Sequence, residues 1–250
     1  VVITGYGTSK RKDLTGSIAT ISSKDFVKGP IISPEQLIAG KVPGVQITPN
    51  NGMPGSGSRI RIRGGTSLRA SNDPLIVIDG VPVDNNSISG ASNPLALINP
   101  NDIESMNILK DASAAAIYGN RAANGVILIT TKKGATGKLK VNFSSVNSVS
   151  VITDKVDILS PSEFKDLVKQ KGNASEIAML GNSTTIWQDE IYSSAFSTDN
   201  NISMSGGISK IPYRFSLGYL NQDGILKSSN LQRTSIGLNL SPKFLDNHLA

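Results

Sequence analysis

Residues 59–134 decide the fold of the first half of this chain and read RIRIRGGTSLRASNDPLIVIDGVPVDNNSISGASNPLALINPNDIESMNILKDASAAAIYGNRAANGVILITTKKG. Within this stretch, 59–63 alternates strictly, so Ile60 and Ile62 share one face of a predicted strand and three arginines share the other. Three further β-prone runs predict strands at 75–79, 103–109 and 126–131. Between the last two, a run of small residues predicts a short helix. These elements predict a compact mixed unit of the α+β class.

Upstream of this stretch, the sequence predicts another helix and a short strand. Ser33 has the chemistry of an N-cap, Pro34 suits the first helical position, and Glu35 complements the helix dipole. Strand 45–48 follows after a Pro-Gly stop. Between two of the strands, residues 84–101 are predicted to form a long polar loop rich in Asn.

Downstream, the sequence changes to long alternating strands. The first 135 residues hold three aromatic side chains and residues 136–250 hold nine, so we predict domains at 1–135 and 136–250. Apolar residues alternate with small polar ones over 138–151, 201–209, 212–220 and 234–241. Two structures share this pattern, a transmembrane β-barrel and a soluble antiparallel sheet. The connections are long, short and intermediate in turn, which favours the barrel.

Composition excludes several classes of site. The chain has no Cys and a single His near its end, which argues against disulfides, thiolate metal sites and a Ser-His-Asp triad. We therefore expect no metal and no cofactor. The net charge of +6 is concentrated in the first 63 residues, but no aromatic stacking set accompanies it, so we expect no nucleic-acid partner. Gly52–Ser58 lacks the context of a phosphate loop.

Several acidic and basic side chains could have either a functional or a purely structural role. Asp79, Asp84, Asp102 and Glu104 match no calcium-loop spacing, which favours turn and capping roles. Arg59, Arg61 and Arg63 have two interpretations, a solvated strand face or a set that pairs with carboxylates of an enclosing wall. A buried Arg–carboxylate pair is directional but contributes uncertain net stability, so a releasable latch would suit it.

Many motifs together, in one order, resemble a known family. They are VVITGYG at 1–7, LTGSI at 14–18, GKVPGV at 40–45, IRIRG at 60–64, PLIVIDGVP at 74–82 and, most strongly, residues 99–134 with NPNDIES and LKDASAAAIYG. The chain resembles the SusC/RagA-type TonB-dependent outer-membrane transporters, and LGYLNQDG at 217–224 extends the resemblance beyond residue 135.

This resemblance implies a plug domain folded inside a barrel of about 22 strands. The sequence accounts for about four barrel strands, so we expect a fragment with an incomplete transmembrane β-barrel. The implied location is the outer membrane of a Gram-negative, Bacteroidetes-like cell. The implied function is nutrient import, not catalysis.

The implied partners are TonB, a SusD-like surface lipoprotein and an oligosaccharide or peptide ligand. A β-prone strip without partners would add an edge strand to TonB; its residues are Val1, Val2, Ile3, Thr4, Gly5, Tyr6 and Gly7. The latch candidates are Arg61, Arg63 and Glu104. The candidates for ligand contact, in the polar loop, are Asn85, Asn86, Ser87 and Asn93. The alternative to transport is a cell-surface binding or adhesion module. A glycan-cleaving enzyme is disfavoured because no acid–base pair is evident.

Overall fold

The structure is a computed structural model and describes residues 2–4, 7–9, 18–64, 72–83, 94–111, 116–208 and 211–242. The N-terminal unit is built on a five-stranded sheet in the order β3-β8-β9-β6-β7, in which β6 and β9 are parallel and the other pairs antiparallel. Its strands are β3 (Ile18–Ser22), β6 (Leu75–Ile78), β7 (Val81–Val83), β8 (Ile103–Leu109) and β9 (Val126–Thr131). The bounds of β8 and β9 agree with the sequence prediction.

Both faces of this sheet are covered, because β8 and β9 send side chains into two apolar clusters. Ile108 and Ile127 belong to one cluster, and Leu109 and Val126 belong to the other. The larger cluster also receives the antiparallel pair β4 (Val45–Pro49) and β5 (Ser58–Ile62). A strand buried on both faces is expected to be almost continuously apolar, as VILIT is at 126–130.

This unit contains short 3-10 helices, which are η2 (Pro34–Ile38), η3 (Pro94–Leu97), η4 (Pro100–Asp102) and η5 (Ala116–Ala122). Segments η2 and η5 overlap the two predicted helices, whereas η3 and η4 lie in the segment predicted as a loop. In η2, the side chain of Ser33 makes no capping hydrogen bond, and Glu35 is buried in the core instead of complementing a helix dipole. Leu37 and Ile38 are buried as well. Core packing, not capping, therefore holds this segment.

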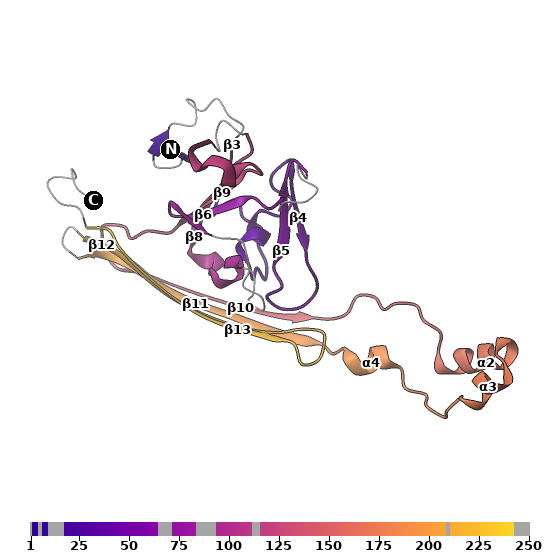
Figure 1. The fold of residues 1–250 in the computed structure, drawn as a ribbon. Coiled ribbons are helices and arrows are strands. Elements are labelled where there is room, and N and C mark those ends of the chain that lie inside the picture. The colour runs from indigo at the N-terminus through magenta and orange to yellow at the C-terminus, as the bar shows by residue number, and fades with distance from the viewer. Residues whose placement is uncertain are drawn as a thin grey trace.

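Strands β10 (Lys140–Ser150), β11 (Ala195–Ile208), β12 (Ile211–Asp223) and β13 (Asn230–Leu240) form a long antiparallel sheet in sequence order. The sheet is curved, and the N-terminal unit lies against one of its faces (Figure 1). The other face carries apolar rows that the strand register aligns, such as Phe143, Ile202, Leu217 and Ile236. Three of these four are exposed, and Ile202 is partly buried. No helix among the described residues is long and apolar enough to cross a bilayer.

The connections of the curved sheet are long at one end and short at the other. Residues 151–194 join β10 to β11 and include α2 (Pro161–Lys171), α3 (Ala174–Ala178) and α4 (Trp187–Ile191), which lie beyond the end of the sheet (Figure 1). Only residues 209–210 separate β11 from β12. Helix α2 begins with a reciprocal capping box formed by Ser160 and Glu163. We call the end with residues 151–194 the long-loop end.

The first residues are paired in the structure. The sequence led us to expect a β-prone strip without a partner, but β1 (Val2–Thr4) pairs antiparallel with β2 (Gly7–Ser9). A two-stranded ribbon still leaves edge hydrogen-bonding groups free on its outer sides. Val1, Gly5 and Tyr6 lie outside the described residues.

Candidate functional site

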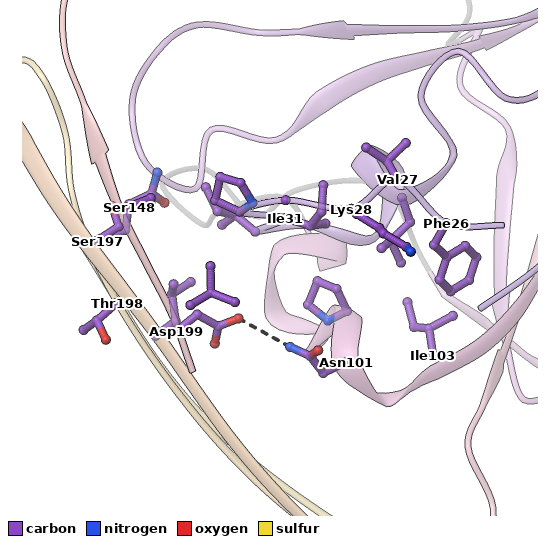
Figure 2. Close-up of a pocket in the computed structure, with 18 of the residues that line it drawn as sticks. Phe26, Val27, Lys28, Ile31, Asn101, Ile103, Ser148, Ser197, Thr198 and Asp199 are labelled. Carbon is purple, nitrogen blue, oxygen red and sulfur yellow. Dashed lines mark hydrogen bonds between the residues drawn. The ribbon is translucent and has the colours of Figure 1, made fainter. Parts of the chain in front are cut away.

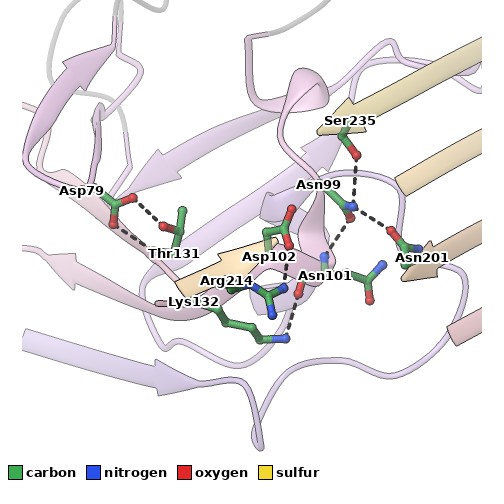
Figure 3. Close-up of polar contacts among 9 residues, drawn as sticks. All are labelled: Asp79, Asn99, Asn101, Asp102, Thr131, Lys132, Asn201, Arg214 and Ser235. Atoms are coloured by element: carbon green, nitrogen blue, oxygen red, sulfur yellow. Dashed lines mark hydrogen bonds and ion pairs between the residues drawn. The ribbon is translucent and has the colours of Figure 1, made fainter. Parts of the chain in front are cut away.

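The N-terminal unit is fastened to the curved sheet by polar side chains around η4 (Figure 3). Asp102 at the end of η4 accepts a hydrogen bond and ion pair from Arg214 of β12, with 2.7 Å between Oδ1 and Nη2. The side chain of Arg214 is 10% exposed and that of Asp102 is 22% exposed. A charge-assisted bond at this burial is stronger and more directional than one in open water.

Lys132, which follows β9, joins the same cluster from the other side. Its Nζ donates to the carbonyl of Asn101 at 2.7 Å, and its backbone NH donates to the carbonyl of Asp102 at 2.8 Å. Burial and the neighbouring Arg214 lower the pKa of Lys132, while Asp102 and Glu104 act in the opposite direction. The Asp102 carboxylate therefore pairs directly with Arg214 and favours the charged form of Lys132 nearby.

Asn99 docks directly onto the inner face of the curved sheet. Its Nδ2 donates to Oδ1 of Asn201 at 2.6 Å and to Oγ of Ser235 at 3.1 Å, and its Oδ1 caps η4 by accepting from the NH of Asn101. Gly218 makes room for this contact, because a Cβ there would lie 2.4 Å from Nδ2 of Asn99. The glycine lets the backbone of β12 approach the N-terminal unit closely.

Arg233 of β13 gives a third contact, to main-chain atoms only. Its Nη1 donates to the carbonyls of Ile32, Ala96 and Ile98, at 2.9, 2.7 and 3.2 Å. These carbonyls lie before η2 and around η3, so one guanidinium joins two segments of the N-terminal unit to the sheet. The unit also touches the β12–β13 connection, where a Cβ on Gly224 would lie 2.8 Å from Cδ of Pro54.

The predicted latch residues lie elsewhere. Arg63 pairs with Asp111 of its own unit, and both side chains are partly exposed. Arg61 is half-buried on β5 opposite Gln46, and Glu104 is exposed on β8 beside Lys132. Among the described residues, the contacts of the N-terminal unit to the sheet come instead from Asn99, Asp102 and the carbonyls bound by Arg233.

The predicted ligand-contact residues Asn85, Asn86, Ser87 and Asn93 lie outside the described residues. The described end of that loop differs from the expected polar loop, because η3 buries Leu95 and Ala96. Asp79 has the predicted turn role: its backbone has a φ of 48°, and its carboxylate accepts from the NH and hydroxyl of Thr131 at 2.9 and 2.6 Å (Figure 3). No group of three or more His, Asp or Glu suited to a metal ion occurs in the described part of the chain.

Sequence reasoning missed the two arginines of the curved sheet. Arg214 and Arg233 each stand on the otherwise small and polar face of a strand, where a long cation needs a partner. A single arginine on such a face is therefore the sequence signal that could have identified these two residues. Their partners, Asp102 and the carbonyls of Ile32, Ala96 and Ile98, lie 112 to 201 residues away in sequence and could not be deduced from spacing.

Comparison with known proteins agrees with this arrangement. The family profile of the TonB-dependent Receptor Plug Domain matches residues 10–126. The TonB-dependent receptor SusC of Bacteroides thetaiotaomicron is 47% identical over the whole chain, which covers 25% of SusC. A chain of the RagAB peptide importer in the 'open-open' state matches 98% of this chain with a TM-score of 0.84 and 29% identity, over 30% of its own length. The chain belongs to the SusC/RagA-type TonB-dependent receptors.

The N-terminal unit is thus the plug, and β10–β13 are barrel strands, which we call the wall. This confirms the predicted family and fold class. The TonB-dependent receptor P3 of Formosa agariphila is also similar, at 41% identity over 94% of the chain and 22% of that receptor. The chain spans about a quarter of the length of these curated relatives.

Proposed function

We propose that this chain is the gating region of an outer-membrane nutrient importer, with domains at 1–135 and 136–250. The plug closes the barrel, and a pull from TonB opens it. The observation that carries this proposal is the chemistry of the plug–wall contact. Its best-defined links are single polar side chains, Arg214, Arg233 and Asn99, and not an interdigitated apolar core. Such hydrogen bonds fix the plug in one position. When they break, the same polar groups can form hydrogen bonds with water instead.

The two faces of the wall support a membrane location. The face away from the plug is apolar in successive aligned rows, whereas the face toward it carries Ser, Asn, Gly and the two arginines. Apolar side chains outside and polar ones inside are typical of an outer-membrane barrel. We therefore place the wall in the outer membrane of a Bacteroidetes-like cell, as its curated relatives imply.

We assign the TonB contact to residues 1–7. Edge groups of the β1–β2 ribbon can pair with a strand of TonB, and main-chain bonds would supply most of the affinity. A pull there reaches β3 next, which is an edge strand held in the sheet by β8 alone. The force then acts on residues 23–32, which end at the carbonyl of Ile32 bound by Arg233.

The remaining partners follow from the family. We propose a SusD-like lipoprotein on the outer side and an oligosaccharide or peptide as ligand, in line with the relatives SusC and RagAB. Asn85, Asn86, Ser87 and Asn93 stay candidates for ligand contact. Arg61, Arg63 and Glu104 stay candidates for contacts with strands that follow β13 in the complete barrel.

Deletion of residues 1–7 from the full-length transporter tests this function. We expect the deletion to abolish accumulation of labelled nutrient while capture of the same nutrient at the cell surface is retained. A matched control replaces exposed Lys171, at the end of α2 and far from the plug, with alanine and should leave both readouts unchanged. Uptake that survives the deletion would contradict the assignment of the TonB contact.

A further inference from the structure

The inner faces of β10 and β11 carry a strip of small polar side chains that the plug covers only in part. In register, Ser148 lies opposite Ser197, Ser144 opposite Asn201, and Asn142 opposite Ser203. We call these six residues the polar strip. The plug reaches the strip through the bond from Asn99 to Asn201, whereas its other fastening contacts fall mainly on β12 and β13, through Arg214, Arg233 and Ser235. The plug is therefore held mainly against β12 and β13 and leaves space over most of β10 and β11.

Two cavities lie along the polar strip. The first, of about 420 Å³, lies toward the long-loop end between the strip and plug residues 23–32 (Figure 2). Ser148 and Ser197 line it from the wall, and Phe26 and Ile31 line it from the plug. The second, of about 380 Å³, lies toward the short-loop end, where Asn142, Ser144 and Ser203 line it from the wall. Each cavity is within the size range of small-molecule sites.

A narrow contact separates the two cavities. Asn101 and Lys132 line both of them, so these two side chains stand at the boundary. There, Nδ2 of Asn101 donates to Oδ2 of Asp199 at 3.4 Å (Figure 2), and Oδ1 of Asp199 accepts from Asn201 at 2.8 Å. The first of these bonds is long, so this link between plug and wall is a weak one.

We propose that the polar strip of β10 and β11 is the route by which ligand crosses the barrel, with the Asn101–Asp199 contact as its constriction. The proposal rests on the proposed import function. Withdrawal of residues 23–32 would remove the plug side of the first cavity while Arg214 still holds η4 on β12. The route then opens beside the plug core, without release of the whole plug from the wall.

The lining defines the class of ligand. Apart from Asp199, the residues of β10 and β11 that line the two cavities carry hydroxyl, amide or apolar groups and no formal charge. The other charged lining residues belong to the plug and to β12, and they are Lys28, Asp102, Lys132 and Arg214. Small neutral donors and acceptors suit an extended, uncharged oligomer that carries its own hydroxyls or amides. Each hydrogen bond that such a ligand forms with the strip replaces a hydrogen bond to water of similar strength. Such a surface holds the ligand weakly at many places, which favours passage over retention.

Single cysteines in the full-length transporter test the route, since this chain has none of its own. The variants are Ser148→Cys in the first cavity, Ser203→Cys in the second, and Asn239→Cys on the inner face of β13. The probe is a membrane-impermeant biotin maleimide, added to cells in rich medium with or without a protonophore. We expect Ser148→Cys to react in both conditions and Ser203→Cys to react more than tenfold faster in energised cells, with little change at Asn239→Cys.

The remaining outcomes separate this route from the general function. Energy-dependent reaction at Asn239→Cys but not at Ser203→Cys would overturn the route and leave gating intact. Reaction at none of the inner positions in energised cells would overturn both. If Ser203→Cys does not assemble in the membrane, Asn142→Cys replaces it, because the two residues pair in register. Ser145 faces the opposite side of β10, and Ser145→Cys serves as the control for assembly of the transporter in the membrane.

A second variant tests the constriction itself. Asn101→Ala removes the amide that reaches Asp199 but keeps the backbone carbonyl that binds Lys132. In the Ser203→Cys background, it should raise maleimide reaction severalfold in cells treated with protonophore. An unchanged rate there would show that Asn101 is not the barrier, and would overturn that part of the proposal.

Discussion

Asp102 is the carboxylate that pairs with Arg214 at the plug–wall contact, and its charge is therefore the critical one in this cluster. We predict that Asp102→Asn weakens the contact by about 2 kcal/mol, because the largely buried guanidinium of Arg214 loses its carboxylate. Hydrogen exchange of β8 and β9 amides in the detergent-solubilised full-length protein measures this loss. Exchange should become about 30-fold faster.

The exposed pair Lys155–Asp189, in the long connection, is the matched control. Asp189→Asn removes the same kind of charge from a pair in open solvent, where an ion pair contributes little. It should leave the exchange of β8 and β9 unchanged. Equal exchange in Asp102→Asn and the unmodified protein would show that Arg214 gains nothing from Asp102.

Glu35 makes the plug sensitive to pH. The side chain is fully buried, and neither carboxylate oxygen has a hydrogen-bond partner among the described residues. Burial raises its pKa, while Ser33 and Ser58 lie near the carboxylate and offset only part of the effect. A carboxyl with a raised pKa stabilises the folded state most in acid, and this contribution is lost as the pH rises from the ordinary pKa of Glu through the raised one.

We predict that Glu35→Gln removes this dependence. Urea unfolding of the plug between pH 4 and 8, compared for the two proteins, should show a difference that grows in favour of the variant as the pH rises. Groups such as Asp25, whose pKa is lowered by hydrogen bonds from Ser22, contribute equally to both proteins and cancel. A difference that does not change with pH would mean that the pKa of Glu35 is the same in the folded and the unfolded plug.

Gly218 sets how closely β12 can approach the plug. A Cβ at this position would lie within 2.4–2.6 Å of polar atoms of Asn99, Asn201 and Ser235. We predict that Gly218→Ala displaces Asn99 and weakens plug docking, although alanine suits a strand at least as well as glycine does. The measurement is entry of a large antibiotic that the closed barrel excludes, which should increase severalfold.

Gly181→Ala is the control for this substitution. Gly181 lies in the long connection, and no atom would lie within 4 Å of its added Cβ. It should change neither barrel assembly nor antibiotic entry. Normal exclusion by a well-assembled Gly218→Ala transporter would argue that Asn99 does not position the plug.

At the level of elements, the sequence predicted what local periodicity controls. The alternation of β10–β13 and the continuous apolar run of β9 are both local, and the structure has each of them. Glu35 was placed in solvent because an N-terminal acid normally complements a helix dipole. Tertiary packing buries Glu35 instead, and nothing in the local sequence indicates this burial.

At the scale of the whole molecule, the candidate site depends on pairings between distant parts of the chain. Arg233 and the carbonyl of Ile32 are 201 residues apart, and the bond exists only because the plug lies on the wall. The family resemblance gave the arrangement of plug and barrel but placed the latch on plug arginines. In the described residues, the cations that bond across the plug–wall contact, Arg214 and Arg233, are on the wall.

The same arrangement predicts how the two parts of this 250-residue chain behave when they are separated. The plug buries its two apolar clusters internally. The wall exposes Phe143 and Ile236 at 70% and 72%, and β10 and β13 have no further strand partner among the described residues. Exposed apolar rows and free strand edges both promote association.

We therefore expect residues 1–135, expressed alone, to remain soluble and largely monomeric, and the whole 250-residue chain to aggregate in plain buffer. Detergent should disperse the whole chain, because micelles cover the apolar face of the wall, but it should leave the plug fragment unchanged. Sedimentation velocity with and without detergent measures both. A monodisperse, cooperatively melting 250-residue monomer in buffer would show that the apolar face of β10–β13 is covered by protein, and would remove the argument that this face meets lipid.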